Sequence, residues 1–259
     1  MSLKLQDKTI VLSGTFDPLM QNLASTLTGF GADIALIGPN VTQARRFSDS
    51  LNDAREIDPN FGRSMIVEAS LTDESSVQEA LSRTAESFGG LDALIDSTVS
   101  HSTGLSFSSS TAEQLLGEAQ AVLHRSLITA QKALKFIECR QKGRVIFLVQ
   151  DSWRWSLPGE EISSVFRSCL QQLTKVLAQE ITEKNITINA VALGVTEPFL
   201  RERFPNAPSI EQALTELKKH CPQARLVENQ DISHLVAFLA SPLSSAISGQ
   251  TLTANGGWI

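Results

Sequence analysis

The sequence contains no tyrosine, so no active site in this chain can rely on a phenol hydroxyl as a proton donor. Cysteine is scarce as well: Cys139, Cys169 and Cys221 are widely spaced and odd in number, which favours a reducing compartment without a disulfide framework. The pair His220–Cys221 has no second pair at ligand spacing, so we expect no metal site.

An excess of positive charge and a long apolar run are also missing. The formal net charge is −6 and the pI is near 5.3, which argues against a surface for nucleic acid or anionic membranes. No apolar run approaches the roughly 20 residues that span a bilayer. The first residues lack the apolar core and the cleavage site of a secretory signal. We therefore expect a cytoplasmic protein without nucleic-acid or membrane partners.

What the sequence does contain fits one large α/β domain. Hydrophobic residues make up 42% and charged residues 19% of the 259 residues, as in a globular protein with a sizeable core. Apolar runs of strand length alternate with helical patterns, which is typical of a parallel sheet covered by helices. The predicted strands are Thr9–Gly14, Ala32–Gly38, Ser64–Ala69, Leu91–Thr98, Gly143–Val149 and Ile188–Leu193. The clearest helices are Leu19–Gly29, Ala112–Ile137, Glu160–Glu183 and Gln230–Ser241.

The helix between the last two of these strands is apolar on more than one side. A surface helix needs only one apolar stripe, so we expect this helix to be covered both by its own sheet and by something else. One row with helical spacing is Phe166, Leu170, Leu173, Leu177 and Ile181, and a second row beside it is Val165, Cys169 and Val176.

Four segments resemble the short-chain dehydrogenase/reductase family. They are GRVIFLV (Gly143–Val149), LTKVLAQEI (Leu173–Ile181), ITINAVALG (Ile186–Gly194) and ISGQTLTANGG (Ile247–Gly257). The resemblance implies a single Rossmann-like doubly wound α/β domain over residues 1–259, with a parallel seven-stranded sheet and helices on both faces. It also implies that residues 196–229 form the variable segment that covers the substrate.

The catalytic residues of that family are absent at the matching positions. Family members carry Tyr-x-x-x-Lys on the central helix, a Ser thirteen residues before the Tyr, and an Asn in the preceding long helix. Ser163 and Arg167 stand in place of the Tyr and Lys, Gln150 in place of the Ser, and Ala121 in place of the Asn. A serine hydroxyl is too weakly acidic and too short for the role of the Tyr, and an arginine cannot shuttle a proton. We therefore predict that this chain has no catalytic residues.

The turn after the first strand, SGTFDPLM, departs from the Thr-Gly-x-x-x-Gly-x-Gly of the family. Gly14 is retained, whereas Pro18 and Met20 stand at the second and third glycines. Proline has no N–H to offer a phosphate, and methionine adds a side chain where glycine lets the backbone approach a pyrophosphate. We expect Asp17 to cap the following helix, with Pro18 at the first helical position.

The other nucleotide contacts of the family are missing too. Gly38 ends the second strand where a carboxylate would hold the adenosine ribose. Ser70 replaces the Asp that contacts adenine, and Asp96 begins the segment that replaces Asn-Asn-Ala-Gly. These separate positions have only the bound cofactor in common, so their joint change predicts that this chain binds no NAD(P).

The leading hypothesis is a pseudoenzyme that assembles with an intact NAD(P)-dependent alcohol or hydroxyacyl-CoA dehydrogenase subunit. Some acyl-thioester-oxidising members of the family, including one in anaerobic toluene (benzylsuccinate) degradation, combine an active and an inactive subunit. The resemblance implies a hetero-oligomer, expected to be a tetramer, with NAD(P) held only by the partner. Its predicted contacts are the helices Ala112–Ile137 and Glu160–Glu183 and the C-terminal Gly256–Ile259.

Two alternatives remain open. One is an oxidoreductase that has relocated its acid, with Asp151 as the candidate residue. The other is a small-molecule-binding module that uses the vacated cofactor cleft.

Overall fold

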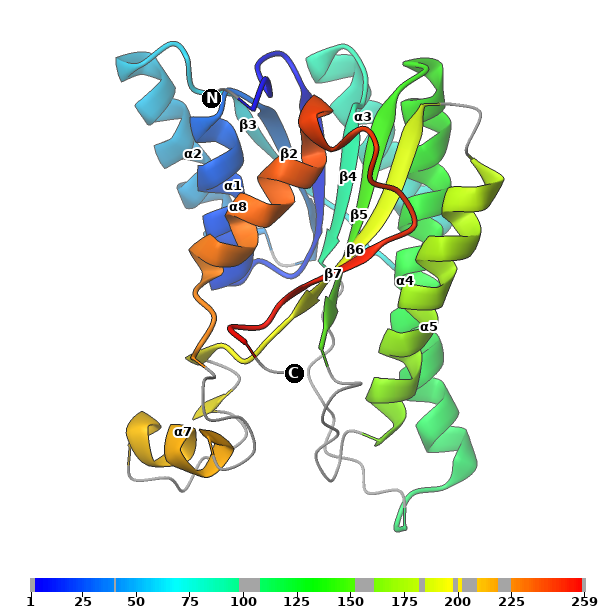
Figure 1. Ribbon diagram of the computed structural model, residues 1–259. Coiled ribbons are helices and arrows are strands. Elements are labelled where there is room, and N and C mark those ends of the chain that lie inside the picture. Colours follow the sequence, from blue (N-terminus) through cyan, green and yellow to red (C-terminus); the bar gives the residue numbers. More distant parts are fainter. Residues whose placement is uncertain are drawn as a thin grey trace.

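The computed structural model describes residues 3–39, 41–97, 108–151, 161–181, 185–197, 200–201, 209–218 and 225–257 (Figure 1). Strands and helices alternate along most of this part of the chain. In order they are β1 (Thr9–Gly14), α1 (Pro18–Gly29), β2 (Asp33–Gly38), α2 (Thr42–Ile57), β3 (Ser64–Glu68), α3 (Glu74–Phe88), β4 (Ala93–Ser97), α4 (Ala112–Cys139), β5 (Gly143–Gln150), α5 (Glu161–Glu180), β6 (Ile186–Leu193), α7 (Ile210–Lys218), α8 (Asn229–Ala240), the short 3-10 helix η2 (Pro242–Ser244) and β7 (Thr251–Ala254).

The seven strands form one parallel sheet in the order β3-β2-β1-β4-β5-β6-β7. The predicted fold, a single Rossmann-like α/β domain with a seven-stranded parallel sheet, is confirmed. The order of the strands reverses between β1 and β4. In Rossmann domains the dinucleotide lies outside the carboxyl ends of the strands at this point.

The strands read as continuous apolar runs because helices cover both faces of the sheet. All six residues of β1 and all eight residues of β6 are buried. One core cluster lies between the sheet and α1, α2 and α8, and the other lies between the sheet and α3, α4 and α5 (Figure 1). Among the helices that the structure describes, none is long and apolar enough to cross a membrane.

Two predicted helix ends are wrong by a few residues. α4 continues to Cys139, two residues beyond the predicted end. α5 ends at Glu180 instead of Glu183, and the chain reaches β6 through Asn185, whose φ of 52° is incompatible with a continuing helix. The segment 196–229, predicted to cover the substrate, is described only at 196–197, 200–201, 209–218 and 225–229, so its role stays a prediction.

Candidate functional site

Five of the positions that match the family's cofactor and catalytic sites lie at the carboxyl edge of the sheet. Gly14, Gly38 and Gln150 end β1, β2 and β5, Asp96 lies one residue before the end of β4, and Ser70 follows β3 by two residues. The fold therefore brings them together at the edge where a Rossmann domain binds its dinucleotide.

The packing of the strand ends itself requires the two glycines. Gly14 has a φ of 146°, and a Cβ added there would lie 2.5 Å from the carbonyl oxygen of Ser97 on β4. A Cβ added at Gly38 would collide with the carbonyl oxygen of Gly14. Glycine is needed at both positions whether or not a nucleotide binds, so neither residue indicates a phosphate site by itself.

The turn between β1 and α1 satisfies the helix N-terminus with its own residues. The Asp17 carboxylate accepts a hydrogen bond of 2.8 Å from the Met20 N–H, and the Gln21 N–H donates to the Asp17 carbonyl oxygen at 3.0 Å. Pro18, at the first helical position, has no N–H to donate. The predicted cap and the predicted place of the proline are confirmed. The N–H groups of Met20 and Gln21, which could otherwise donate to a phosphate, are thus hydrogen-bonded to Asp17. The negative charge of the Asp17 carboxylate lies beside them.

Side chains fill the space between this turn and the end of β2. Met20 is only 2% exposed and belongs to the core on the α1 and α8 side of the sheet. Next to it, the rings of Phe16 in the turn and Phe47 on α2 lie 5.5 Å apart between their centroids. The cavity left between the turn, Gly38 and α2 is about 10 Å³, which is no more than the space of one water molecule.

A larger cavity of about 330 Å³ lies along the ends of β1 and β3. Its volume is at the lower end of the roughly 300–1,000 Å³ that small-molecule pockets occupy. The side chains of Thr15, Glu68, Ser70, Thr72 and Arg125 bring polar groups to it, and the hydroxyls of Ser70 and Thr72 lie 3.1 Å apart. This cavity offers charges of both signs to a small polar molecule.

Asp96 has a structural role at the end of β4. Its carboxylate is 1% exposed and accepts hydrogen bonds from the hydroxyls of Ser13 on β1, at 2.7 Å, and Ser126 on α4, at 2.5 Å. Hydrogen bonds offset part of the cost of burying a polar group. One carboxylate therefore links β1, β4 and α4, a connection that the sequence analysis missed.

The positions of the family's catalytic residues are described only in part. Gln150 is half-buried at the end of β5, opposite Leu193 of β6. Ala121 lies on an exposed part of α4. Ser163 and Arg167 lie within the first two turns of α5, and their side chains are outside the described residues. Of the two described side chains, one has no functional group and the other is an amide, which is neither an acid nor a base.

Asp151, the candidate for a relocated acid, is anchored in the sheet. It is 3% exposed, its N–H donates to the Leu193 carbonyl oxygen at 2.7 Å, and its Oδ2 accepts from Asn255 Nδ2 at 3.1 Å. The carboxylate thus ties the end of β5 to the segment after β7.

Near that segment, a hydrogen bond from Arg225 lowers the pKa of Asp231.

Some sequence candidates lie outside the described residues. The pair His220–Cys221 is one of them, and the C-terminal Trp258 and Ile259 are another. The description ends at Gly257, which like Gly256 has a positive φ. The predicted C-terminal contact therefore stays a prediction.

Comparisons with known proteins agree with this fold. The family model described as enoyl-(acyl carrier protein) reductase matches residues 21–259. Oxidoreductase UcpA of Escherichia coli (strain K12) is 26% identical over 262 residues, which cover 98% of this chain and 95% of that protein. The 3-oxoacyl-(acyl-carrier-protein) reductase FabG of Aquifex aeolicus (strain VF5) is 24% identical over 262 residues, which cover 99% of each. The structure of a short-chain dehydrogenase/reductase from Serratia marcescens BCRC 10948 matches with a TM-score of 0.83 at 23% identity, over 98% of each chain.

Proposed function

The chain belongs to the short-chain dehydrogenase/reductase family, and we propose that it is a non-catalytic member that binds no NAD(P) and supports an intact dehydrogenase subunit. The relatives named above are an oxidoreductase and a 3-oxoacyl-(acyl-carrier-protein) reductase. The partner's reaction is accordingly the NAD(P)-dependent oxidation or reduction of an alcohol, a hydroxyacyl-CoA or its keto form. The observation that carries the proposal is the β1–α1 turn, in which the Asp17 carboxylate accepts the Met20 N–H, Pro18 offers no N–H, and Met20 stands where the family has a glycine.

We expect a dinucleotide at this turn to compete with Asp17 and to require a shift of Met20, which stands at the position of the family's third glycine. A phosphate at the N-terminus of α1 would compete with Asp17 for the Met20 N–H and would be repelled by the carboxylate. Moving Met20 out of the core would leave a cavity, and cavities of that kind cost about 2–5 kcal/mol. A Kd of about 100 μM corresponds to only about −5.5 kcal/mol, so such a cost removes most of a useful affinity.

Acidic side chains at this edge of the sheet also have structural roles. Asp96 is bonded to Ser13 and Ser126, and Asp151 is bonded to Asn255. An active site has to leave its acids and bases within reach of a substrate. Because these carboxylates join strands and helices, their contacts support a role in packing rather than in catalysis.

Two neighbouring helices carry uncovered apolar side chains, as a subunit interface requires. On α4, Leu116 is 63% and Leu127 is 45% exposed, and on α5, Val165 is 54% and Val176 is 50% exposed. Exposed apolar side chains on two helices that pack together favour a contact with another protein. We assign this surface to a contact with the intact subunit.

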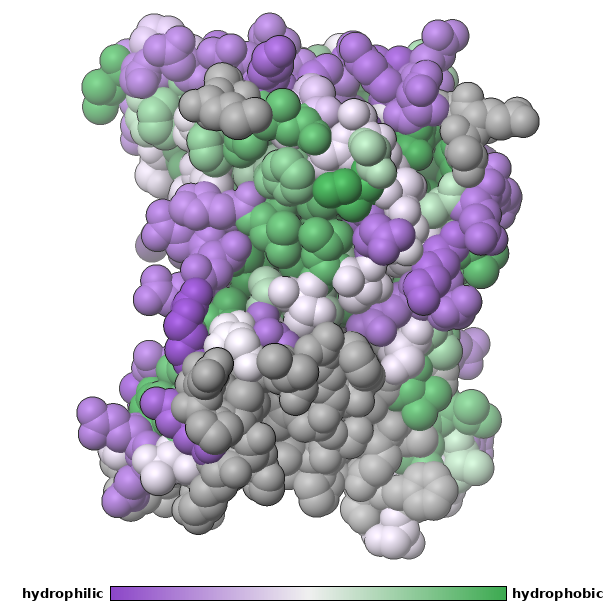
Figure 2. Space-filling view, viewed as in Figure 1, coloured by the Kyte–Doolittle hydropathy of each residue, from purple (hydrophilic) through white to green (hydrophobic). Residues whose placement is uncertain are grey.

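A second apolar surface lies beside β7, at the edge of the sheet. Figure 2 shows it as a green area between α8 and α5, in the region of β7. β7 is the last strand of the sheet, and all four of its residues are half-buried. The half-buried apolar residues of this region include Leu235, Phe238, Ile247, Leu252 and Ala254. Two different surfaces are what a tetramer with two kinds of contact needs.

A small-molecule-binding module is the second candidate, and the cavity of about 330 Å³ with Arg125 and Glu68 favours it. An oxidoreductase that uses Asp151 is the third. It requires the Asp151 carboxylate, now buried and bonded to Asn255, to reach a substrate.

Purification of the tagged chain from its native host tests the proposed assembly. We expect it to co-purify in a fixed ratio with a family member that has an intact Tyr-x-x-x-Lys, and the NAD(P)-dependent activity to require that partner. Val176→Glu on α5 should release the partner, whereas Ile57→Glu, which places the same charge on an exposed apolar residue of α2, should not. A monomeric chain that oxidises an alcohol by itself would contradict the proposal.

A further inference from the structure

A cavity of about 750 Å³ lies at the amino edge of the sheet, opposite the edge that holds the changed cofactor positions. The beginnings of β5 and β6, the residues before β1 and β4, and the connection from α8 to β7 enclose it. This edge is at the top of Figure 1, and Figure 2 shows hydrophilic side chains, in purple, along the same rim. The volume falls within the roughly 300–1,000 Å³ of ligand pockets.

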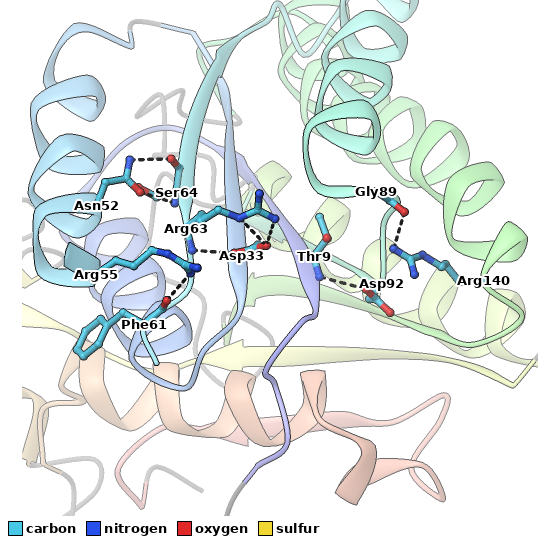
Figure 3. Close-up of polar contacts among 10 residues, drawn as sticks. All are labelled: Thr9, Asp33, Asn52, Arg55, Phe61, Arg63, Ser64, Gly89, Asp92 and Arg140. Atoms are coloured by element: carbon cyan, nitrogen blue, oxygen red, sulfur yellow. Dashed lines mark hydrogen bonds and ion pairs between the residues drawn. The ribbon is translucent and has the colours of Figure 1, made fainter. Parts of the chain in front are cut away.

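The residues around this cavity carry a net positive charge, opposite in sign to the net charge of the whole chain. The formal net charge of the protein is −6, yet the cavity is lined by four basic side chains, Lys4, Lys8, Lys142 and Arg144, and one carboxylate, Asp92. Asp92 accepts hydrogen bonds of 3.1 Å from the Lys8 ammonium and from the Thr9 N–H, and Figure 3 shows the second of these. The surplus of charge in the cavity is therefore positive, which attracts anions.

Arg144 places a guanidinium in the cavity wall without a carboxylate partner among the described residues. Its Nε donates to the Ser241 carbonyl oxygen at 3.2 Å, and its Nη1 donates to the Gly143 carbonyl oxygen at 2.8 Å. Both acceptors are neutral, and burial lowers the pKa of Arg144. A half-buried charge is stabilised by a counter-ion, so an anion beside this guanidinium would be favourable.

Thr187 adds a hydroxyl next to this guanidinium. Thr187 is opposite Arg144 in the register of β5 and β6, and it lines the same cavity. Its hydroxyl is buried and has no hydrogen-bond partner among the residues that the structure describes. Buried polar groups without a partner are rare and call for an explanation. A ligand oxygen in the cavity would provide one once the Thr187 side chain turned toward it, because the hydroxyl itself has almost no accessible surface.

The rest of the lining is mixed. Gln141, Asn185, Ser245 and Ser248 bring polar groups to it, and Ala178, Ile186, Ala240 and Pro242 bring apolar groups, so the cavity combines basic and apolar parts. A bare inorganic ion would leave the apolar part in contact with water, and a neutral apolar molecule would leave the basic part unused. We propose that this cavity binds an organic phosphate with an apolar body, with the phosphate near Arg144, Lys142 and Lys4 and the body against the apolar part.

Three probes separate the two parts of the ligand: 2-naphthyl phosphate, 2-naphthol with the same body, and inorganic phosphate with the same charged group. Calorimetric titration of the full chain should give a Kd for 2-naphthyl phosphate that is at least roughly tenfold lower than for either of the others. Equal affinity for 2-naphthol and 2-naphthyl phosphate would overturn the proposal, as would no binding of 2-naphthyl phosphate at about 1 mM.

Two double variants with the same charge locate the site. Lys4→Gln with Lys142→Gln removes charge from the cavity, and Lys135→Gln with Lys218→Gln removes it from exposed positions on α4 and α7, so both change the formal net charge from −6 to −8. The first should weaken binding roughly tenfold and the second by less than about twofold. Equal losses, or a first variant that lowers only the stability of the fold, would show that the lysines do not form a binding site.

Discussion

The hydroxyl of Ser126 on α4 donates a hydrogen bond of 2.5 Å to the carboxylate of Asp96 on β4, and both side chains are buried. With the hydrogen bond from Ser13, it makes one buried carboxyl group the junction of a helix and two strands. The junction stands where the family resemblance places Asn-Asn-Ala-Gly. Asp96 therefore has a packing role at this position.

Removing the Ser126 hydroxyl tests this junction. We predict that Ser126→Ala lowers the free energy of unfolding by about 1–3 kcal/mol, because it leaves a buried carboxylate with one donor fewer. Urea denaturation at neutral pH measures it. Ser87→Ala, at an exposed position near the end of α3, should change the same quantity by no more than about 0.5 kcal/mol. Similar losses of unfolding free energy for Ser126→Ala and Ser87→Ala would show that the hydrogen bond to Asp96 does not stabilise the fold.

Truncation of Met20 tests whether its side chain fills the space beside the β1–α1 turn. Met20→Ala should cost about 2–5 kcal/mol of folding stability, because the residue is 2% exposed and the adjoining cavity is already small. Ile57→Ala, at a position that is 87% exposed, should cost less than about 0.5 kcal/mol. A loss below about 1 kcal/mol for Met20→Ala would indicate that the turn can open at little cost.

Asp231 makes the free energy of unfolding depend on pH in the acidic range. Hydrogen bonds from Arg225, at 2.8 Å, and from the Glu228 N–H, at 3.1 Å, lower its pKa. Because the folded-state pKa lies below the unfolded value of about 3.9, this stabilisation is complete above the unfolded value and is lost as the pH falls through the folded one. The stability of Asp231→Asn and of Arg225→Ala should therefore fall less steeply than that of the parent between about pH 5 and about pH 2. The difference is small because the pair is largely exposed. Parallel curves of unfolding free energy against pH would contradict it.

Restoring the catalytic residues alone should not restore activity. The triple change Ser163→Tyr, Arg167→Lys and Gln150→Ser supplies the family's side chains, but Pro18 and Met20 remain in the phosphate turn. We expect no NAD(P)H turnover above that of the parent chain with acetoacetyl-thioester or simple ketone substrates. Turnover by the triple variant would show that the dinucleotide site had survived.

The sequence was sufficient for the features that depend on neighbouring residues. Apolar runs predicted β1 and β6 because strands buried on both faces need no polar alternation. Asp17 was recognised as a cap because the bond to Met20 spans three residues. Helix ends such as Glu180 were less certain, since the left-handed Asn185 that turns the chain toward β6 has no strong signal in the sequence.

The rest depended on contacts between distant residues. Asp96 and Ser126 are thirty residues apart, and only the pairing of β1, β4 and α4 brings their side chains together. The basic residues Lys4 and Lys142 are 138 residues apart in the sequence and meet only at the amino edge of the sheet. No periodicity or local motif relates such residues, so the structure was needed to find the carboxylate junction and the basic cavity.

Titration of the isolated chain with NADH and with NADPH tests the central claim most directly. The Lys4→Gln, Lys142→Gln variant serves beside the parent, so that binding of phosphate groups at the amino edge is not mistaken for binding at the β1–α1 turn. If Asp17 and Met20 prevent a pyrophosphate from binding at the turn, as proposed, neither cofactor binds either protein with a Kd below about 100 μM. A Kd below that value in both proteins, for either cofactor, would contradict the account.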